Sequence, residues 1–135
     1  MKIVVEKTVK APIAKVWDAY TTPSDIKQWN AASDDWHTTH ATVDLREGGT
    51  FTSRMEAKDG SFGFDFSGTY TKVVPHECIA YVFGDRSATV QFVANANHVL
   101  VRISFDPETQ NPLEMQRGGW QAILDNFAKF VEATQ

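Results

Sequence analysis

The chain has 135 residues, of which 42% are hydrophobic and 22% charged, a balance that is typical of one globular domain and too apolar for a disordered chain. No apolar run approaches the roughly 20 residues that cross a membrane, and the charged N-terminal residues do not resemble a secretion signal. A net charge of −4 without a basic cluster argues against a nucleic-acid partner. The single cysteine, Cys78, excludes an internal disulfide and agrees with a reducing, cytoplasmic setting.

The first 39 residues predict a strand, two helices and a loop. Alternating apolar and charged side chains predict a strand over Lys2–Lys10. Apolar residues then follow Pro12 at helical spacing as far as Tyr20. A second short helix is expected over Ser24–Trp29, and the polar stretch Asn30–Thr39 is typical of a loop.

From Ala41 the hydrophobic pattern changes to a period of two, which is typical of strands. Turns that contain glycine, such as Glu47-Gly48-Gly49 and Asp59-Gly60, separate the segments. The clearest alternation runs from Phe62 to Tyr70. The predicted strands are Thr42–Arg46, Phe51–Lys58, 62–70, Cys78–Phe83, Ala88–Ala94 and Val99–Phe105.

The period returns to 3.6 after Pro112 and predicts one long C-terminal helix. Gly118 and Gly119 lie within it, which indicates either a gap beside the helix or close packing of the helix on the sheet. One helix cannot cover a flat sheet of this size, so we expect an α+β fold in which a curved, seven-stranded antiparallel sheet wraps around the C-terminal helix. A sheet curled in this way leaves a gap lined by inward-facing side chains, and we place function there.

Several short motifs resemble one known family over essentially the whole chain. They are Ala11-Pro12, Val16-Trp17, Tyr20, Pro23, Trp29, the segment DLREGGTF at 44–51, Asp59-Gly60, Gly68-Thr69-Tyr70, Val73-Val74-Pro75, Gly119-Trp120, Leu124 and Phe127. Together with the order of elements, they resemble the START-like superfamily (SRPBCC, helix-grip fold), and within it the homologues of the activator of heat-shock protein 90 ATPase. The resemblance implies one helix-grip domain over residues 1–135, with two short helices after the first strand. Polyketide cyclases, lipid carriers and co-chaperone domains share this scaffold, so the fold alone selects no function.

The strand registers and the inner stripe of the helix predict which side chains line the gap. The predicted ligand-binding residues are Phe51, Ser53, Met55, Phe64, Phe66, Tyr81, Phe83, Phe92, Trp120, Ile123, Leu124 and Phe127. Apolar walls with few polar groups are typical of a site for a hydrophobic ligand. The alternative is that these rings meet and fill the space as an ordinary core.

The resemblance also implies where the cavity opens. In the family fold, the segment after the two short helices borders the entrance, which predicts Trp29, Trp36, His37 and His40 there. The alternative for the two tryptophans is a hydrophobic lid that is packed for stability.

Polar side chains offer no clear catalytic centre. Alternation points Arg54 outward toward an acidic neighbour, although a bulge would turn it inward as an anion anchor. His37 and His40 form an H-x-x-H pair without an obvious third metal ligand. His76 precedes Cys78 by two residues, a pattern that fits a core cysteine beside a turn better than a nucleophile and its base. We therefore predict no catalytic residue, no metal and no cofactor.

We expect the chain to be a soluble protein that binds a hydrophobic or amphipathic small molecule between the sheet and the C-terminal helix. One alternative is a cyclase-like enzyme that polarises a substrate carbonyl through Tyr81, Ser53 or an inward Arg54. Another is a co-chaperone module that acts on a chaperone ATPase through its surface, and a second copy of the chain is the other protein partner considered. If the cavity exists, Trp120→Ala should change the uptake of an apolar probe more than Arg86→Ala does.

Overall fold

A seven-stranded antiparallel sheet curls around the C-terminal helix in the computed structural model, which describes residues 2–134. The strands are β1 (Ile3–Val9), β2 (Trp36–Val43), β3 (Thr50–Ala57), β4 (Gly63–Val74), β5 (Cys78–Phe83), β6 (Arg86–Asn95) and β7 (His98–Phe105). The helices are α1 (Ile13–Thr21), α2 (Pro23–Trp29) and α3 (Leu113–Ala133). The sheet order is β1-β7-β6-β5-β4-β3-β2, a meander from β2 to β7 that β1 joins at its far edge. The predicted α+β helix-grip fold, with two short helices after the first strand, is confirmed.

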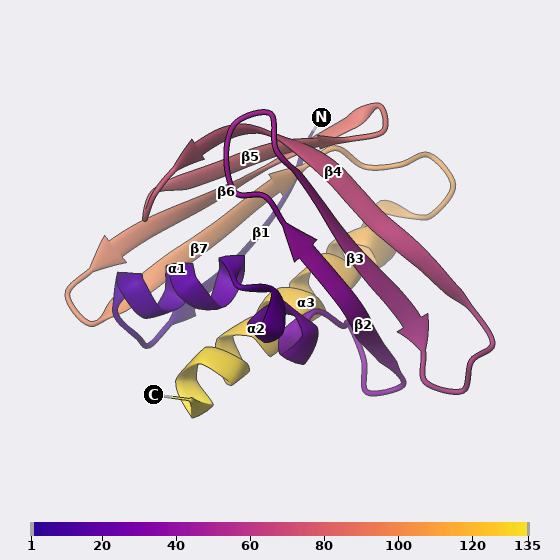
Figure 1. The fold of residues 1–135 in the computed structure, drawn as a ribbon, viewed down its shortest axis with the longest axis horizontal. Helices are drawn as coiled ribbons and strands as arrows, with labels where there is room; N and C mark the ends of the chain where they lie inside the picture. Colours follow the sequence, from indigo (N-terminus) through magenta and orange to yellow (C-terminus); the bar gives the residue numbers. More distant parts are fainter. Residues whose placement is uncertain (1, 135) are drawn as a thin grey trace.

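Bulges help the sheet to curve. The pairing register shifts between Thr38 and His40 in β2 and between Tyr70 and Lys72 in β4, and bulges of this kind bend a strand and increase its twist. In Figure 1 the sheet arches over α3, and α1 and α2 lie together at one end of the arch. None of the helices within residues 2–134 combines the length and the apolar character that crossing a lipid bilayer requires.

Inward-facing side chains of the sheet and one face of α3 form the core. Along β7, fully buried residues alternate with half-buried ones over the whole strand, as the period-two pattern predicts. Phe105 of β7 and Phe127 of α3 are the largest fully buried side chains. Removal of such apolar surface from water, at about 25 cal/mol per Å², holds the helix in the concave face of the sheet.

The observed strand boundaries differ from the predicted ones mainly at β2. We expected a loop over Asn30–Thr39 and a strand over Thr42–Arg46, whereas the strand begins at Trp36 and ends at Val43. β2 lies at the edge of the sheet, so many of its side chains face solvent and the apolar alternation that marks a half-buried strand is missing.

Candidate functional site

An apolar cavity of about 320 Å³ lies between the concave face of the sheet and α3. Its wall consists of Tyr20, Thr21, Ile26, Trp29, Asn30, Thr42, Val43, Phe51, Ser53, Met55, Phe64, Phe66, Tyr70, Ile79, Tyr81, Arg86, Ile103, Trp120, Ile123, Leu124 and Phe127. The volume falls at the lower end of the range of about 300–1,000 Å³ that is typical of small-molecule sites. The rings of the wall therefore leave a space between them that they do not fill.

Ten of the twelve residues predicted to bind a ligand line this cavity, and Phe83 and Phe92 do not. Phe92 packs edge-on against Trp17 of α1, with ring centroids 5.2 Å apart. Phe83 packs against Phe66 and Trp120, with ring centroids at 5.3 and 6.1 Å. Alternation along a strand gives the face that a side chain occupies, but it does not give which neighbours cover that side chain. That the ten lining residues hold a ligand remains a prediction.

Three tyrosines, Tyr20, Tyr70 and Tyr81, line the cavity and differ from its other aromatic rings in carrying a hydroxyl. Burial raises the pKa of each above its ordinary value of 10.0, to about 12 for Tyr70, and the nearby phenols raise the pKa of Tyr20 and Tyr81 further. All three are therefore neutral at pH 7 and able to donate a hydrogen bond. Neither Tyr20 nor Tyr70 is among the twelve predicted ligand-binding residues, although strand alternation places Tyr70 on the same face as Phe64 and Phe66 and helical spacing places Tyr20 on an inner face.

The turn between β2 and β3 holds Tyr70 in place. The backbone N–H of Gly48 donates to the carbonyl oxygen of Tyr70 at 2.8 Å, and the N–H of Tyr70 donates to the carbonyl oxygen of Gly49 at 2.9 Å. Gly48 has a φ of +85°, and a Cβ at Gly49 would overlap the backbone oxygen of Asp44. The predicted glycine turn therefore fixes part of the cavity wall in addition to joining two strands.

Arg86 carries the only charge among the described residues of the lining. It is the first residue of β6 and lies opposite Phe83 of β5, and its guanidinium carbon is 4.6 Å from the centre of the Phe83 ring. We did not predict Arg86 because the predicted strand began at Ala88. Extending the buried positions Phe92, Val90 and Ala88 back by one step of two residues would have placed Arg86 on the inner face.

Trp29, which we predicted at the entrance, is part of the packed wall. It is 6% exposed, stacks on Tyr20 at 5.2 Å between ring centroids and packs edge-on against Phe127 at 4.9 Å. Its indole N–H donates to the backbone oxygen of Ala19 at 3.0 Å. These contacts match the alternative of a packed lid, and they tie α1, α2 and α3 together at one end of the cavity.

The other three predicted entrance residues, Trp36, His37 and His40, lie in β2 outside the cavity lining. Trp36 and His37 line a second hollow beside α2, and His40 is exposed. Within residues 2–134, no group of three His, Cys, Asp or Glu side chains is placed to hold a metal ion.

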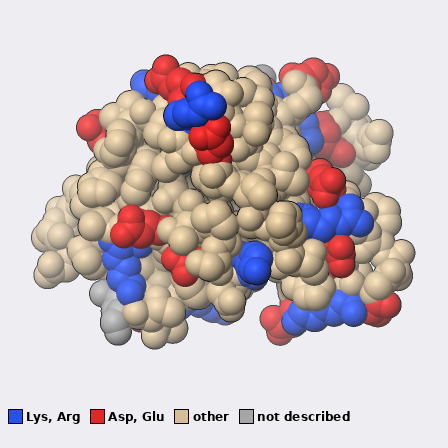
Figure 2. Space-filling view, viewed as in Figure 1, with Lys and Arg blue, Asp and Glu red and all other residues tan. Residues whose placement is uncertain are grey.

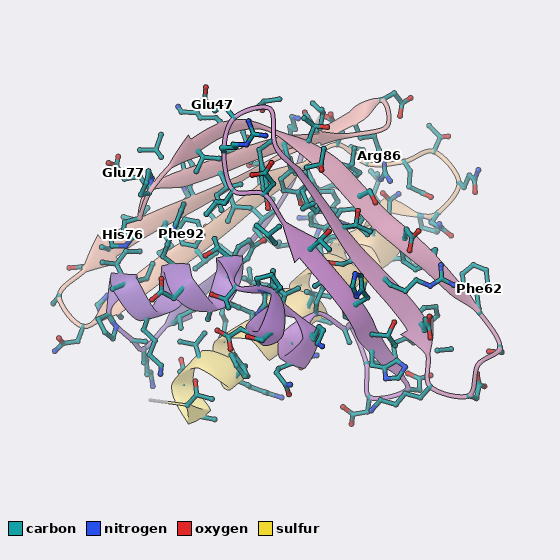
Figure 3. All side chains as sticks on the ribbon, viewed as in Figure 1. Glu47, Phe62, His76, Glu77, Arg86 and Phe92 are labelled. Atoms are coloured by element: carbon teal, nitrogen blue, oxygen red, sulfur yellow. The ribbon has the colours of Figure 1, made fainter. Side chains whose placement is uncertain are left out.

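Trp36 forms an aromatic tip with Phe62 and Phe64 at the end of β2, β3 and β4. The ring centroids of Phe62 and Phe64 lie 6.1 and 6.0 Å from that of Trp36. Phe62 is 62% exposed and Phe64 is 41% exposed, and Figure 3 shows Phe62 at the opposite end of the molecule from His76. Phe64 also lines the cavity, so apolar surface continues from the cavity to the outside of the molecule.

Charged residues elsewhere lie on the outer surface. Arg54 points outward as predicted, with Nε 3.0 Å from a Glu56 oxygen and Nη1 3.5 Å from an Asp65 oxygen. Figure 2 shows both signs of charge interspersed among wide uncharged areas. His76 and Cys78 lie outside the cavity lining. An outward Arg54 serves neither as an anion anchor in the cavity nor as the group that polarises a carbonyl in the cyclase alternative.

Comparison with known proteins identifies the family. The sequence model of the family described as "Activator of Hsp90 ATPase homolog 1-like protein" matches residues 10–132 of this chain. A search of the curated proteins finds no match.

Solved structures agree with the family match. The chain is 47% identical to the AHSA1-like protein from Aeromonas hydrophila, with 99% of this chain and 94% of that chain covered and a TM-score of 0.93. It is 46% identical to a protein from Cytophaga hutchinsonii, with 98% and 93% covered and a TM-score of 0.84. A protein from Chromobacterium violaceum is 25% identical, with 98% of both chains covered and a TM-score of 0.86. The chain therefore belongs to the family of Activator of Hsp90 ATPase homolog 1-like proteins.

Proposed function

We propose that this chain binds a hydrophobic or amphipathic small molecule in the cavity between the sheet and α3. The supporting observation is the cavity itself, in which mostly apolar walls surround about 320 Å³. A ligand that enters it buries apolar surface, which contributes about 25 cal/mol per Å² before the cost of ordering is subtracted. Native mass spectrometry of the freshly purified protein would identify the ligand class if a molecule copurifies.

A neutral fluorescent probe and a cavity-filling variant test the proposal. N-phenylnaphthylamine brightens in apolar surroundings, and we expect the wild-type chain to take it up. Ser53 is 6% exposed and lines the cavity, so Ser53→Leu places a larger side chain in the binding space. We expect this change to weaken the affinity for the probe about tenfold or more, as measured by fluorescence titration.

The matched control is Thr52→Leu, because Thr52 is the preceding residue of β3 and its hydroxyl lies 2.9 Å from that of Ser67, outside the cavity lining. This variant should bind the probe as the wild-type chain does. Absence of probe uptake by the wild-type chain, or an equal loss in both variants, would contradict the proposal.

Trp120 is less suited to this test than the sequence indicated. Its ring stacks on Phe105, with centroids 3.9 Å apart and an angle of 7° between the planes. Trp120→Ala would cost about 3–5 kcal/mol of stability as well as a cavity wall. Arg86 lines the cavity, so Arg86→Ala is not a neutral reference.

Binding to a chaperone ATPase is the second candidate function. It is supported by the description of the family and by the aromatic tip, whose Phe62 is 62% exposed. Neighbouring large apolar side chains that remain exposed are typical of protein-binding surfaces.

A further inference from the structure

Arg86 differs from the other arginines in what surrounds it. The four others pair with carboxylates: Arg46 with Asp44, Arg54 with Glu56 and Asp65, Arg102 with Glu6, and Arg117 with Glu114. Within residues 2–134, no carboxylate pairs with Arg86, and no acidic side chain lines the cavity that it faces. The cavity of a chain with net charge −4 is thus lined by one positive charge and no negative one.

The Phe83 ring positions the guanidinium of Arg86. A distance of 4.6 Å from the guanidinium carbon to the ring centroid is a cation–π contact. A cation–π contact of this kind uses none of the guanidinium N–H groups as a conventional hydrogen-bond donor, so they remain available to a ligand. Arg86 is half-buried and lines the cavity, so these donors can reach a molecule bound there.

Tyr81 lies near Arg86 and adds a second kind of donor. The two residues are on neighbouring strands, and both line the cavity. The positive charge of Arg86 offsets a small part of the rise that burial causes in the pKa of Tyr81. The Tyr81 hydroxyl remains protonated at neutral pH, so it can donate a hydrogen bond beside the charged one.

We propose that the cavity binds an amphipathic organic anion, with a carboxylate group at Arg86 and Tyr81 and an apolar tail along the aromatic wall. The inference rests on the proposed small-molecule function and specifies the chemistry of the ligand. A carboxylate accepts the paired N–H groups of a guanidinium in a fixed geometry. Phe66, Met55 and Phe64, which also line the cavity, offer apolar contacts to the tail.

Decanoate and decanol form the matched pair of ligands for the test. They share a slim ten-carbon chain, but decanoate ends in a charged carboxylate and decanol in a neutral hydroxyl. Comparing their affinities therefore separates the contribution of the head group from that of the apolar tail. Isothermal titration calorimetry at about pH 8, where the carboxylate is ionised, measures both. We expect Arg86→Gln to weaken decanoate binding about tenfold or more and to change decanol binding less than about twofold.

Companion variants keep the test interpretable. Tyr81→Phe should weaken decanoate binding selectively, and Arg86→Lys should retain part of the affinity because it keeps the charge without the planar fork. Arg102→Gln removes a surface arginine that pairs with Glu6 and should change neither affinity. Circular dichroism of each variant establishes that it is folded, and if Arg86→Gln does not fold, the other two cavity variants decide.

The outcomes separate this inference from the proposed function. If both ligands bind and the folded cavity variants lose neither selectively, or if decanol alone binds, the carboxylate site is overturned while small-molecule binding stands. If neither ligand binds and N-phenylnaphthylamine does not bind either, the proposed function fails and this inference fails with it. If the probe binds but neither ligand does, only the inference is overturned.

Discussion

The stability of the folded chain at alkaline pH depends on the three tyrosines that line the cavity, Tyr20, Tyr70 and Tyr81. A tyrosine in the unfolded chain ionises near pH 10, whereas burial raises the pKa of these three in the folded chain, to about 12 for Tyr70. A group whose pKa is higher in the folded state contributes stability that is fully present below its unfolded pKa. That stability is lost as the pH rises through the folded pKa.

We predict that the free energy of unfolding falls between about pH 10 and about pH 12, with Tyr81 alone contributing up to about 1.4 kcal/mol per pH unit. Urea unfolding at a series of pH values measures this slope. Tyr81→Phe should show a shallower slope because phenylalanine cannot ionise. The same slope in wild type and variant would show that Tyr81 ionises as easily in the folded chain as in the unfolded one.

Individual cavity residues were predictable where a long alternation fixed the inner face. Phe51, Ser53 and Met55 of β3 line the cavity as their pattern indicates. Arg86 was not predictable by hydrophobicity, because a charged residue that faces inward breaks the rule by which inner positions are recognised. Trp29 was expected at the entrance, and its burial depends on contacts with α1 and α3 that no local pattern reports.

The helix α3 contains two glycines whose role the sequence left open. Apart from the nearby backbone of the helix itself, a Cβ at Gly118 or Gly119 would meet no atom within 4 Å, so of the two alternatives close packing against the sheet is ruled out. Neither residue lines the cavity. The pair therefore lowers the intrinsic stability of the helix, by about 1 kcal/mol for each glycine relative to alanine, with no gain in packing.

Gly118→Ala should accordingly raise the free energy of unfolding by about 1 kcal/mol, which urea denaturation would detect. Gly68→Ala is the contrasting variant, because its Cβ would lie 2.6 Å from the backbone oxygen of Val82 and 2.8 Å from the Phe51 ring. This second change should destabilise the protein. A loss of stability in Gly118→Ala would mean that α3 needs the freedom of a glycine at this position.

Elements with a long, regular pattern were predicted well, and β5 was predicted to the residue as Cys78–Phe83. The start of β2 was not predicted. Trp36 and His37 adopt an extended conformation because they pair with Ala57 and Glu56 of β3, and their own sequence pattern does not indicate a strand. For an edge strand, the neighbouring strand decides where pairing begins, and a single-sequence pattern does not contain that information.

At the scale of the whole molecule, the described residues form an apolar cavity and an exposed aromatic tip, and these correspond to the two candidate functions. The curl of the sheet around one helix followed from the order of the elements. The size of the cavity did not, because it depends on whether the rings interlock, and this is set by side-chain packing throughout the core.

We predict that Phe62→Ser will separate the two functions. If the aromatic tip binds a chaperone, this change should weaken the affinity for Hsp90 from the same organism about tenfold or more and leave probe uptake unchanged. The rate of ATP hydrolysis by the chaperone, titrated with the chain, provides the measurement.

Val93→Ser is the control for this experiment, because Val93 is 51% exposed on β6 and lies outside the tip. An equal effect of both changes, or no response of the chaperone to the wild-type chain, would remove the second candidate. Neither result would bear on binding in the cavity.

The position of β1 at the edge beyond β7 has a consequence for synthesis. Ile3 pairs with Phe105 and Val9 with Val99, so β1 leaves the ribosome long before its partner strand exists. The strands β2 to β7 can assemble hairpin by hairpin, whereas β1 must wait with its apolar residues uncovered. Closing so long a loop is slow, and a nascent chain in this state is open to aggregation until the last strand has been made.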